Sequence, residues 1–153
     1  MNTFYKNKSV LITGVCGTVG AELSRQLLTS KEFSIRELIG IDNNEGELFN
    51  LDQEYLNEER ARYFVSDIRD KDTLATLMEG VDIVFHCAAL KHVVLCERSP
   101  VEAVTNNIIG VQNVIYAALQ NSVSKVIFTS SDKAVNPTNV MGTSKLMGER
   151  LMT

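Results

Sequence analysis

The segment from Ser130 to Lys145 reads SSDKAVNPTNVMGTSK and gathers side chains that can move protons. A carboxyl group can donate a proton, an amine can accept one and a hydroxyl can relay one, which are the requirements of general acid–base catalysis. Met141 lies four residues before Lys145 and cannot carry a proton. The alternative is a solvated turn with a local ion pair. The candidate catalytic residues are Ser131, Asp132, Lys133, Met141 and Lys145.

A second motif, TGVCGTVG, has the glycine spacing of a dinucleotide-binding turn. Gly14 permits a sharp turn out of a strand, Gly17 lets the backbone approach a pyrophosphate, and Gly20 lets the next helix pack closely on the sheet. Free amides at the start of that helix, at Thr18 and Val19, would then meet the phosphates together with the helix dipole. The alternative is an ordinary glycine-rich turn.

Asp42 ends the apolar run LIGID, twenty-two residues after Gly20. A carboxylate at this place can accept hydrogen bonds from both ribose hydroxyls of an adenosine, and it would repel a 2′-phosphate. The following residues, NNEGEL, contain no lysine or arginine to bind such a phosphate. We therefore predict NAD as the cofactor, with NADP as the alternative. Asp42 could instead be a surface acid or a helix cap, a role open equally to Asn43 and Asn44.

Two more apolar runs end in residues that suit a cofactor. Asp67 and Ile68 could flank an adenine ring, and the small residues Ala88 and Ala89 would leave room for the cofactor's middle and ribose. Asp67 could equally be a turn former, and the alanines could be small for packing alone. The conjunction of these run ends with the glycine turn is a stronger indication than any one of them.

Short apolar runs alternate with helical patterns along the whole chain, which predicts an α/β fold with a doubly wound parallel sheet of the Rossmann type and strand order 3-2-1-4-5. In such sheets ligands bind beyond the carboxyl ends of the strands, where we expect the residues named above. We treat residues 1–153 as one NAD(P)-binding domain. The predicted strands are 10–12, 38–42, 61–67, 81–87 and 123–130. The predicted helices are 20–30, a polar helix ending near 55, 71–80, a long helix opened by Pro100, and a last one from about Asn139 to the chain end.

Composition excludes several classes of function. The net charge of −4 and the pI of about 5.2 give no basic face for nucleic acid. No apolar stretch approaches the roughly 20 residues that span a bilayer, and the N-terminus lacks a signal-peptide pattern, so we expect a cytoplasmic protein. Cys16, Cys87 and Cys96 show no paired spacing, which predicts reduced thiols and no metal site.

Together the segments TGVCGTVG, HCAALKHV and SSDKAVNP resemble the extended short-chain dehydrogenase/reductase superfamily. Within it, the sequence is most similar to the polysaccharide-biosynthesis branch of UDP-N-acetylglucosamine 4,6-dehydratases. The resemblance implies a redox-neutral reaction that oxidises sugar C4, removes water across C5 and C6 and returns the hydride to C6. We also expect a homo-oligomer that acts on a UDP-sugar.

The resemblance also implies roles for individual residues. Asp132 would be the acid for the leaving C6 hydroxyl and Lys133 the base for C5, with lysine at this place typical of C5-inverting enzymes. Lys145 would hold the nicotinamide ribose, and Lys91 would face the substrate. Asn107 would hold the backbone near the fourth strand. His92 could be a packed or capping imidazole.

Met141 occupies the position at which the superfamily has tyrosine as the proton acceptor for C4. Either Lys133 or the hydroxyls of Ser130 and Ser131, through water, take over this step, or the protein is an NAD-binding module without catalysis. A UDP-sugar C4 epimerase is a third alternative, although epimerisation needs no C5 base. The resemblance further implies that a substrate domain holding the nucleotide-sugar is absent from these residues, so we expect little or no turnover from the chain alone.

Overall fold

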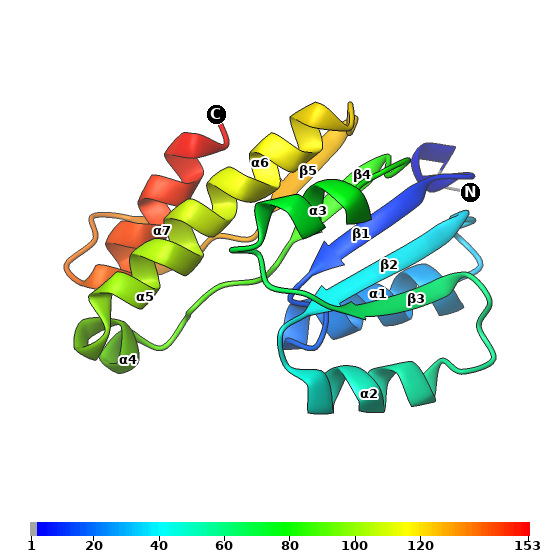
Figure 1. The fold of residues 1–153 in the computed structure, drawn as a ribbon, viewed down its shortest axis with the longest axis horizontal. Coiled ribbons are helices and arrows are strands. Elements are labelled where there is room, and N and C mark those ends of the chain that lie inside the picture. Colours follow the sequence, from blue (N-terminus) through cyan, green and yellow to red (C-terminus); the bar gives the residue numbers. More distant parts are fainter. Residues whose placement is uncertain (1–2) are drawn as a thin grey trace.

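The computed structural model describes residues 3–153, which form a five-stranded parallel sheet in the order β3-β2-β1-β4-β5 (Figure 1). This is the strand order predicted from the sequence. Parallel pairing joins β1 to both β2 and β4, so β1 lies at the centre of the sheet. The strands are β1 (Ser9–Thr13), β2 (Glu37–Asp42), β3 (Ala61–Val65), β4 (Ile83–His86) and β5 (Lys125–Phe128).

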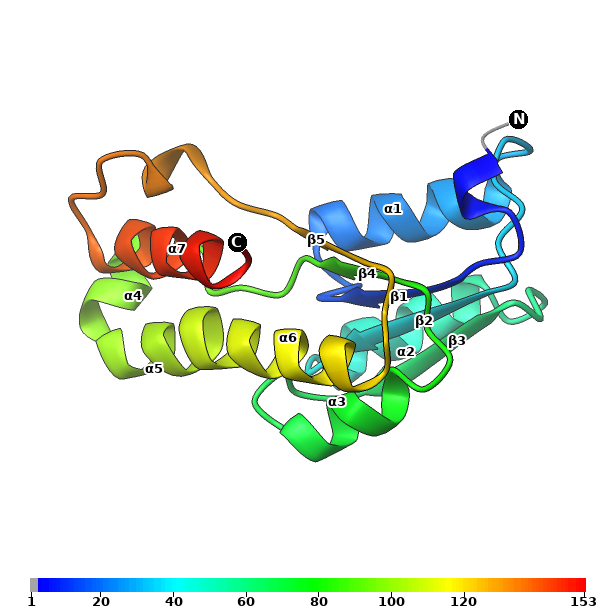
Figure 2. The ribbon, with the colours of Figure 1, turned by 90° about the horizontal axis from the view of Figure 1, so that it is seen from above.

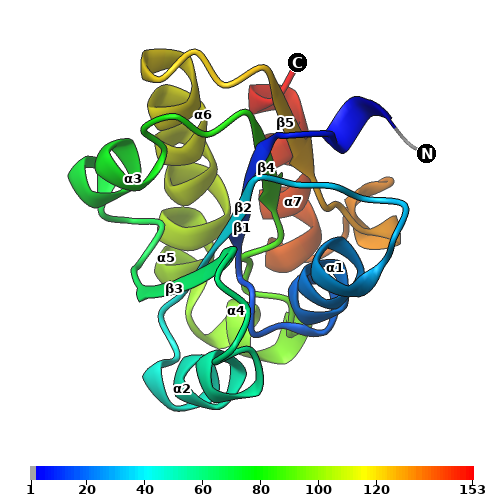
Figure 3. The same cartoon turned by 90° about the vertical axis from the view of Figure 1, so that its right-hand side faces the viewer.

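Helices cover both faces of the sheet (Figures 2 and 3). The core therefore has two halves, and the side chains of β1 point alternately into one and the other. Val10 and Ile12 pack with leucines of α1 (Thr18–Thr29) and α2 (Glu45–Glu54) on one face. Leu11 points to the opposite face and packs with residues of α3 (Lys71–Leu77) and α6 (Val111–Gln120). Successive side chains of a strand point to opposite faces, so a buried strand must be apolar on both.

The long helix opened by Pro100 has a π-helical segment in its middle. It runs as α5 (Pro100–Val104), the π segment η2 (Thr105–Gly110) and α6. Gly110 is close to β3's outgoing loop, since a Cβ added there would lie 2.6 Å from the Ile68 Cδ1 atom. Asn107 lies in the same segment and is buried; it donates to the Leu90 carbonyl (2.9 Å) and accepts from the Leu90 amide (2.8 Å). The predicted structural role of Asn107 beside the fourth strand is confirmed.

The last helix, α7 (Val140–Leu151), begins where the sequence predicts, because the Asn139 side chain accepts from the Gly142 amide at 2.8 Å. The short helix α4 (Val93–Arg98) was not predicted. Two 3-10 helices of three residues each are η1 (Thr3–Tyr5), near the N-terminus, and η3 (Asp132–Ala134), after β5. Within residues 3–153, no helix has both the length and the apolar character needed to cross a membrane.

Candidate functional site

A cleft of about 620 Å³ opens at the carboxyl ends of the strands. Parallel strands bring these ends to one edge of the sheet (Figure 1). The cleft gathers the predicted cofactor, substrate and catalytic residues with one exception, Asp132. The predicted residues that line it are Gly14, Gly17, Thr18, Val19, Gly20, Asp42, Asp67, Ile68, Ala88, Ala89, Lys91, Ser131, Lys133, Met141 and Lys145.

The glycine turn after β1 is fixed by contacts of its own backbone. Gly14 has a φ of +67°, and a Cβ added to it would lie 2.7 Å from the Ala88 backbone. A Cβ on Gly20 would overlap the Gly14 carbonyl oxygen. These two glycines are therefore required for the turn to form at all, whether or not a ligand binds.

Gly17 is less constrained by the protein than Gly14 and Gly20. It has an ordinary φ of −72°, and an added Cβ would meet only the Gly14 carbonyl oxygen, at 3.3 Å. Gly17 is exposed and precedes the first turn of α1, whose amides at Thr18 and Val19 have no preceding helical carbonyls to bind. The first turn also carries no acidic side chain. The turn thus offers bare backbone and a helix N-terminus to an anion.

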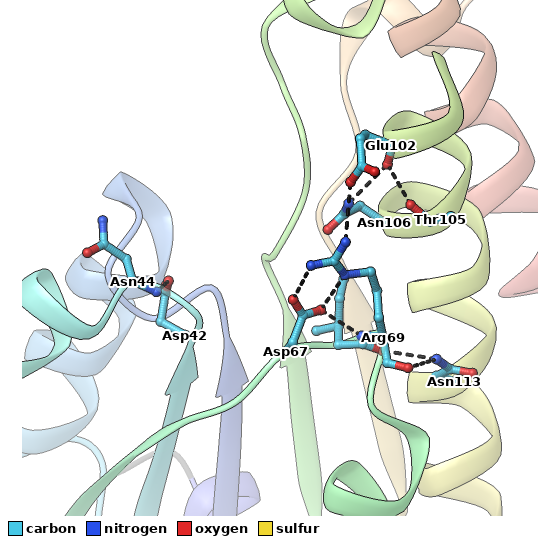
Figure 4. A network of polar contacts seen from close by, with 9 residues as sticks. Asp42, Asn44, Asp67, Arg69, Glu102, Thr105, Asn106 and Asn113 are labelled. Atoms are coloured by element: carbon cyan, nitrogen blue, oxygen red, sulfur yellow. Dashed lines mark hydrogen bonds and ion pairs between the residues drawn. The ribbon is translucent and has the colours of Figure 1, made fainter. Parts of the chain in front are cut away.

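Asp42 at the end of β2 is held in place by backbone amides (Figure 4). One carboxylate oxygen accepts from the Cys16 amide and the other from the Asn44 amide, both at 3.0 Å. Each oxygen keeps a further lone pair for another donor. The cap of α2 is Asn44, which accepts from the Glu47 amide at 3.2 Å. The helix-cap alternative for Asp42 is therefore wrong.

Asp67 and Ile68 after β3 are engaged with the protein. Asp67 forms an ion pair with Arg69 at 2.6 Å, and Arg69 continues to Glu102 at 3.2 Å (Figure 4). The hydrogen bond from Arg69 lowers the pKa of Asp67. Ile68 is only 6% exposed and packs against Gly110. Both residues still reach the cleft wall, so their adenine-flanking role stays a prediction, but Ile68 offers little surface to a ring.

A buried polar network lies behind the glycine turn. The Ala88 amide donates to the Thr13 hydroxyl oxygen (3.2 Å), and that hydroxyl is 2.6 Å from the Nδ1 atom of His86. Either atom can donate in this contact, depending on the tautomer of His86. His86 is fully buried and its Nε2 atom has no partner among the described residues. Burial, and then the charge of Lys145, lower the pKa of His86 to about 3.

Lys145 is 5% exposed, although it lines the cleft. Its Nζ atom donates to the Thr129 carbonyl at 2.6 Å and lies 4.2 Å from the centroid of the Phe128 ring. The same ring is stacked with His86, with centroids 5.7 Å apart. Burial lowers the pKa of Lys145 to about 8. Lys145 thus lines the cleft with an amine whose pKa lies near neutral pH, and its place beside a cofactor stays a prediction.

The consecutive residues Ser131, Asp132 and Lys133 do not all face the cleft. Lys133 lines the cleft and its Nζ atom is 3.4 Å from Asp132. The Asp132 side chain is 87% exposed and does not line the cleft. Ser131 donates to Asp132 at 3.1 Å, and this bond, followed by the charge of Lys133, lowers the pKa of Asp132. A general acid needs the opposite shift, so the predicted acid is outside the site in this conformation.

Of the remaining predicted residues, Met141 and Lys91 line the cleft and His92 does not. Met141 is 3% exposed and packs with Cys96 and Ala103 while contributing to the cleft wall. Lys91 is exposed at the cleft rim, between β4 and α4. His92 occupies the N-cap position of α4 without a side-chain cap bond and is exposed, so it is neither a packed nor a capping imidazole.

Several lining residues were not predicted as site residues. Glu47 belongs to a polar helix whose helical pattern hid its proximity to Asp42, and Thr129 directly precedes the serines after β5. Nothing in the sequence marked these residues as part of a site, because their types are common in helices, loops and strand ends. The full set is Cys16, Ile41, Asn43, Asn44, Glu47, Ser66, Cys87, Leu90, Asn106 and Thr129. Ser130, predicted as an alternative proton relay, also lines the cleft.

Comparison with known proteins gives a family model described as polysaccharide biosynthesis protein, which matches residues 10–153. A protein of Methanocaldococcus jannaschii described as an uncharacterized membrane protein is 52% identical, over 99% of this chain and 44% of its own length. A UDP-N-acetylglucosamine 4,6-dehydratase (inverting) of Campylobacter jejuni is 39% identical, over 96% of this chain and 43% of its own length. A UDP-glucose 4-epimerase of Rickettsia typhi is 40% identical, over 96% and 43%.

Solved structures agree with the fold. The X-ray structure of Pen from Bacillus thuringiensis has a TM-score of 0.90 and 44% identity, covering 97% of this chain and 44% of that one. The dTDP-glucose 4,6-dehydratase DesIV of Streptomyces venezuelae, solved with NAD and TYD bound, has a TM-score of 0.84 and 26% identity, covering 94% and 50%. The chain spans less than half the length of the three curated relatives.

Proposed function

The chain belongs to the polysaccharide biosynthesis protein family, and on that premise we propose that it is the NAD-binding part of a nucleotide-sugar 4,6-dehydratase. The proposed reaction converts UDP-N-acetylglucosamine to a 4-keto-6-deoxy sugar with inversion at C5. Relatives carrying the names of sugar dehydratases and epimerases support the class of reaction. Because those relatives are more than twice as long, we propose that the UDP moiety binds to residues outside these 153.

One observation carries the proposal: a single cleft joins a turn with bare backbone amides to three lysines. Its acidic lining residues lie at or after β2 and β3 or on α2, and its lysines follow β4 and β5 or lie on α7. Because β2 and β3 lie on one side of central β1 and β4 and β5 on the other, the cleft has an acidic end and a basic end. This polarity suits a dinucleotide whose adenosine ribose lies at the acidic end and whose nicotinamide lies at the basic end, beside an anionic sugar nucleotide. The acidic lining residues are Asp42, Glu47 and Asp67, and the basic ones are Lys91, Lys133 and Lys145.

The residues present fit NAD. Gly17 and the amides of Thr18 and Val19 would hold the pyrophosphate, and Asp42 would accept from the ribose hydroxyls with the lone pairs that its backbone donors leave free. Ala88 adds no bulk at the middle of the cleft. When bound, NAD supplies the hydride acceptor at one step and the hydride donor at the other.

Lys133 is the proposed base for C5, since it lines the cleft at the mouth of β5. Asp132 is the proposed acid for the C6 hydroxyl, a role that requires η3 to turn its carboxyl inward from its exposed position. Lys91 at the rim is the proposed contact for the sugar or its phosphate. We place the protein in the cytoplasm, a reducing compartment that suits its three free cysteines.

Replacing Asp42 with alanine should change cofactor preference. The variant loses the acceptor for the ribose hydroxyls and the charge that repels a 2′-phosphate, so NAD binds about tenfold more weakly while NADP binding improves. Titration of each cofactor into wild type and variant measures this. The matched control is Asp52→Ala, an exposed acid later in α2, which should change neither affinity. Unchanged NAD affinity in Asp42→Ala would remove this carboxylate from the cofactor site.

A C4 epimerase is the second candidate, supported by the 40% identity to enzymes of that name. Incubating the whole protein with UDP-N-acetylglucosamine separates the candidates by product. A 4-keto-6-deoxy sugar supports the dehydratase, and UDP-N-acetylgalactosamine supports the epimerase. Tight NAD binding with no product identifies an NAD-binding module without catalysis.

A further inference from the structure

Oxidation of the sugar C4 hydroxyl needs a proton acceptor in the cleft, and this inference rests on the proposed dehydratase function. The Met141 thioether lines the cleft but cannot take a proton. Another side chain at the basic end must therefore do so.

The neighbouring candidates are already engaged or lack a basic form. The Ser130 hydroxyl donates to Glu149, and the Ser131 hydroxyl donates to Asp132. Burial raises the pKa of Cys87 to about 11, so it is a neutral thiol and no base near pH 7. Lys133 already has a step assigned at C5 and is paired with Asp132.

Lys145 has the geometry of an acceptor. Lys145 lines the cleft, is almost excluded from solvent and follows Met141 by one helical turn on the same face of α7. A protonated amine at this place would find the Thr129 carbonyl at 2.6 Å and the face of the Phe128 ring at 4.2 Å. The two contacts stabilise the ammonium that would form.

We propose that the Nζ atom of Lys145 accepts the proton of the sugar C4 hydroxyl. The O–H bond breaks, its proton bonds to the Nζ lone pair, and the oxygen electrons form the C4 carbonyl. The C4 hydrogen would leave with its electron pair as a hydride, which NAD would accept when bound. The amine thus does at position 145 what the side chain at position 141 cannot do.

The surroundings of Lys145 keep part of it neutral. The titratable groups that face it are His86 and Cys87 from the end of β4 and Glu149 from the next turn of α7. His86 and Cys87 are both uncharged near neutral pH, and burial is the largest influence on Lys145, holding its pKa at about 8. About a tenth of the protein then carries the free amine at pH 7.

The test is Lys145→Arg in the whole protein. Arginine keeps a cation for the cofactor but cannot give up its proton, so NAD affinity should be retained while turnover falls about 100-fold. Adding Met141→Tyr to this variant supplies a new acceptor one turn away, and turnover should recover. If the unaltered protein is active and Lys145→Arg keeps its turnover, the inference is overturned while the proposed function stands. If the unaltered protein forms no product, the proposed function fails, and this inference with it.

A second measurement does not depend on catalysis or on how arginine packs. Nitrogen-15 NMR of labelled lysine side chains, with Lys145 assigned by its absence in Lys145→Arg, follows the amine as pH rises. We expect its midpoint near 8, as against about 10.4 for a solvated lysine. A midpoint above about 10 would overturn the inference.

Discussion

Replacing Lys133 with alanine in the whole protein lowers turnover of UDP-N-acetylglucosamine by about 10²- to 10⁴-fold, the usual contribution of a positioned general base. Lys133 reaches the cleft from η3, and its removal takes away the proposed acceptor for the C5 proton. Affinity for NAD should stay within about twofold, because the residues proposed to hold the diphosphate and ribose lie after β1 and β2. Steady-state kinetics combined with NAD titration measures both effects.

The matched control is Lys125→Ala, which replaces an exposed lysine at the start of β5, the end of the strand far from Lys133. It should leave both turnover and NAD affinity unchanged. If Lys133→Ala keeps full turnover, the C5 base is another group. If the variant loses NAD affinity as well as turnover, Lys133 also supports the structure of the cleft and is not only a base for the substrate.

Acid should destabilise the protein at a pH where its carboxylates are still ionised, and His86 is the reason. An unfolded histidine takes up a proton near pH 6.5, whereas the pKa of buried His86 is about 3. The unfolded state therefore binds more protons throughout this interval, so stability is full above pH 6.5 and is lost as pH falls toward 3. Between pH 6.5 and 4.5 the free energy of unfolding should fall by about 2–3 kcal/mol.

The variant that tests this is His86→Asn, whose side-chain amide can replace Nδ1 as the partner of the Thr13 hydroxyl but cannot titrate. It should be less stable at pH 7 because the buried ring is lost, yet show a nearly flat profile between pH 6.5 and 4.5. The chain has only one other histidine, the exposed His92, and His92→Asn should keep the wild-type slope. Urea unfolding at stepped pH gives the profiles, and an unchanged slope in His86→Asn would contradict the assignment.

Local sequence patterns were sufficient for the sheet and the glycine turn. Each apolar run is long enough for one strand, and the carboxylate of Asp42 marks the end of β2. Right-handed crossovers leave few strand orders for such a series. Gly14 and Gly20 could be predicted from the sequence because the turn after β1 leaves no room for a side chain at either position.

Other features depend on contacts between distant segments and could not be derived from local patterns. The π segment arises where the long helix meets Ile68 and Leu90, far away in sequence. Asp132 shares a motif with Lys133, but the 3-10 turn directs its carboxylate to solvent. The buried state of Lys145 likewise follows from Phe128, which the sequence shows only as one more apolar residue of a strand.

The most direct test of the account is a calorimetric titration of NAD into the whole protein and its Gly17→Ala variant. The added methyl group occupies the backbone surface proposed for the pyrophosphate yet meets the protein only at the Gly14 carbonyl oxygen. Gly46→Ala is the matched control, a glycine in the first turn of α2 whose added Cβ meets only Asn44 Oδ1, at 3.8 Å. We expect wild type and Gly46→Ala to bind NAD equally and Gly17→Ala, still folded with at most a small loss of thermal stability, to bind at least about tenfold more weakly. Equal NAD binding by all three proteins would contradict the central claim that the dinucleotide lies against this turn.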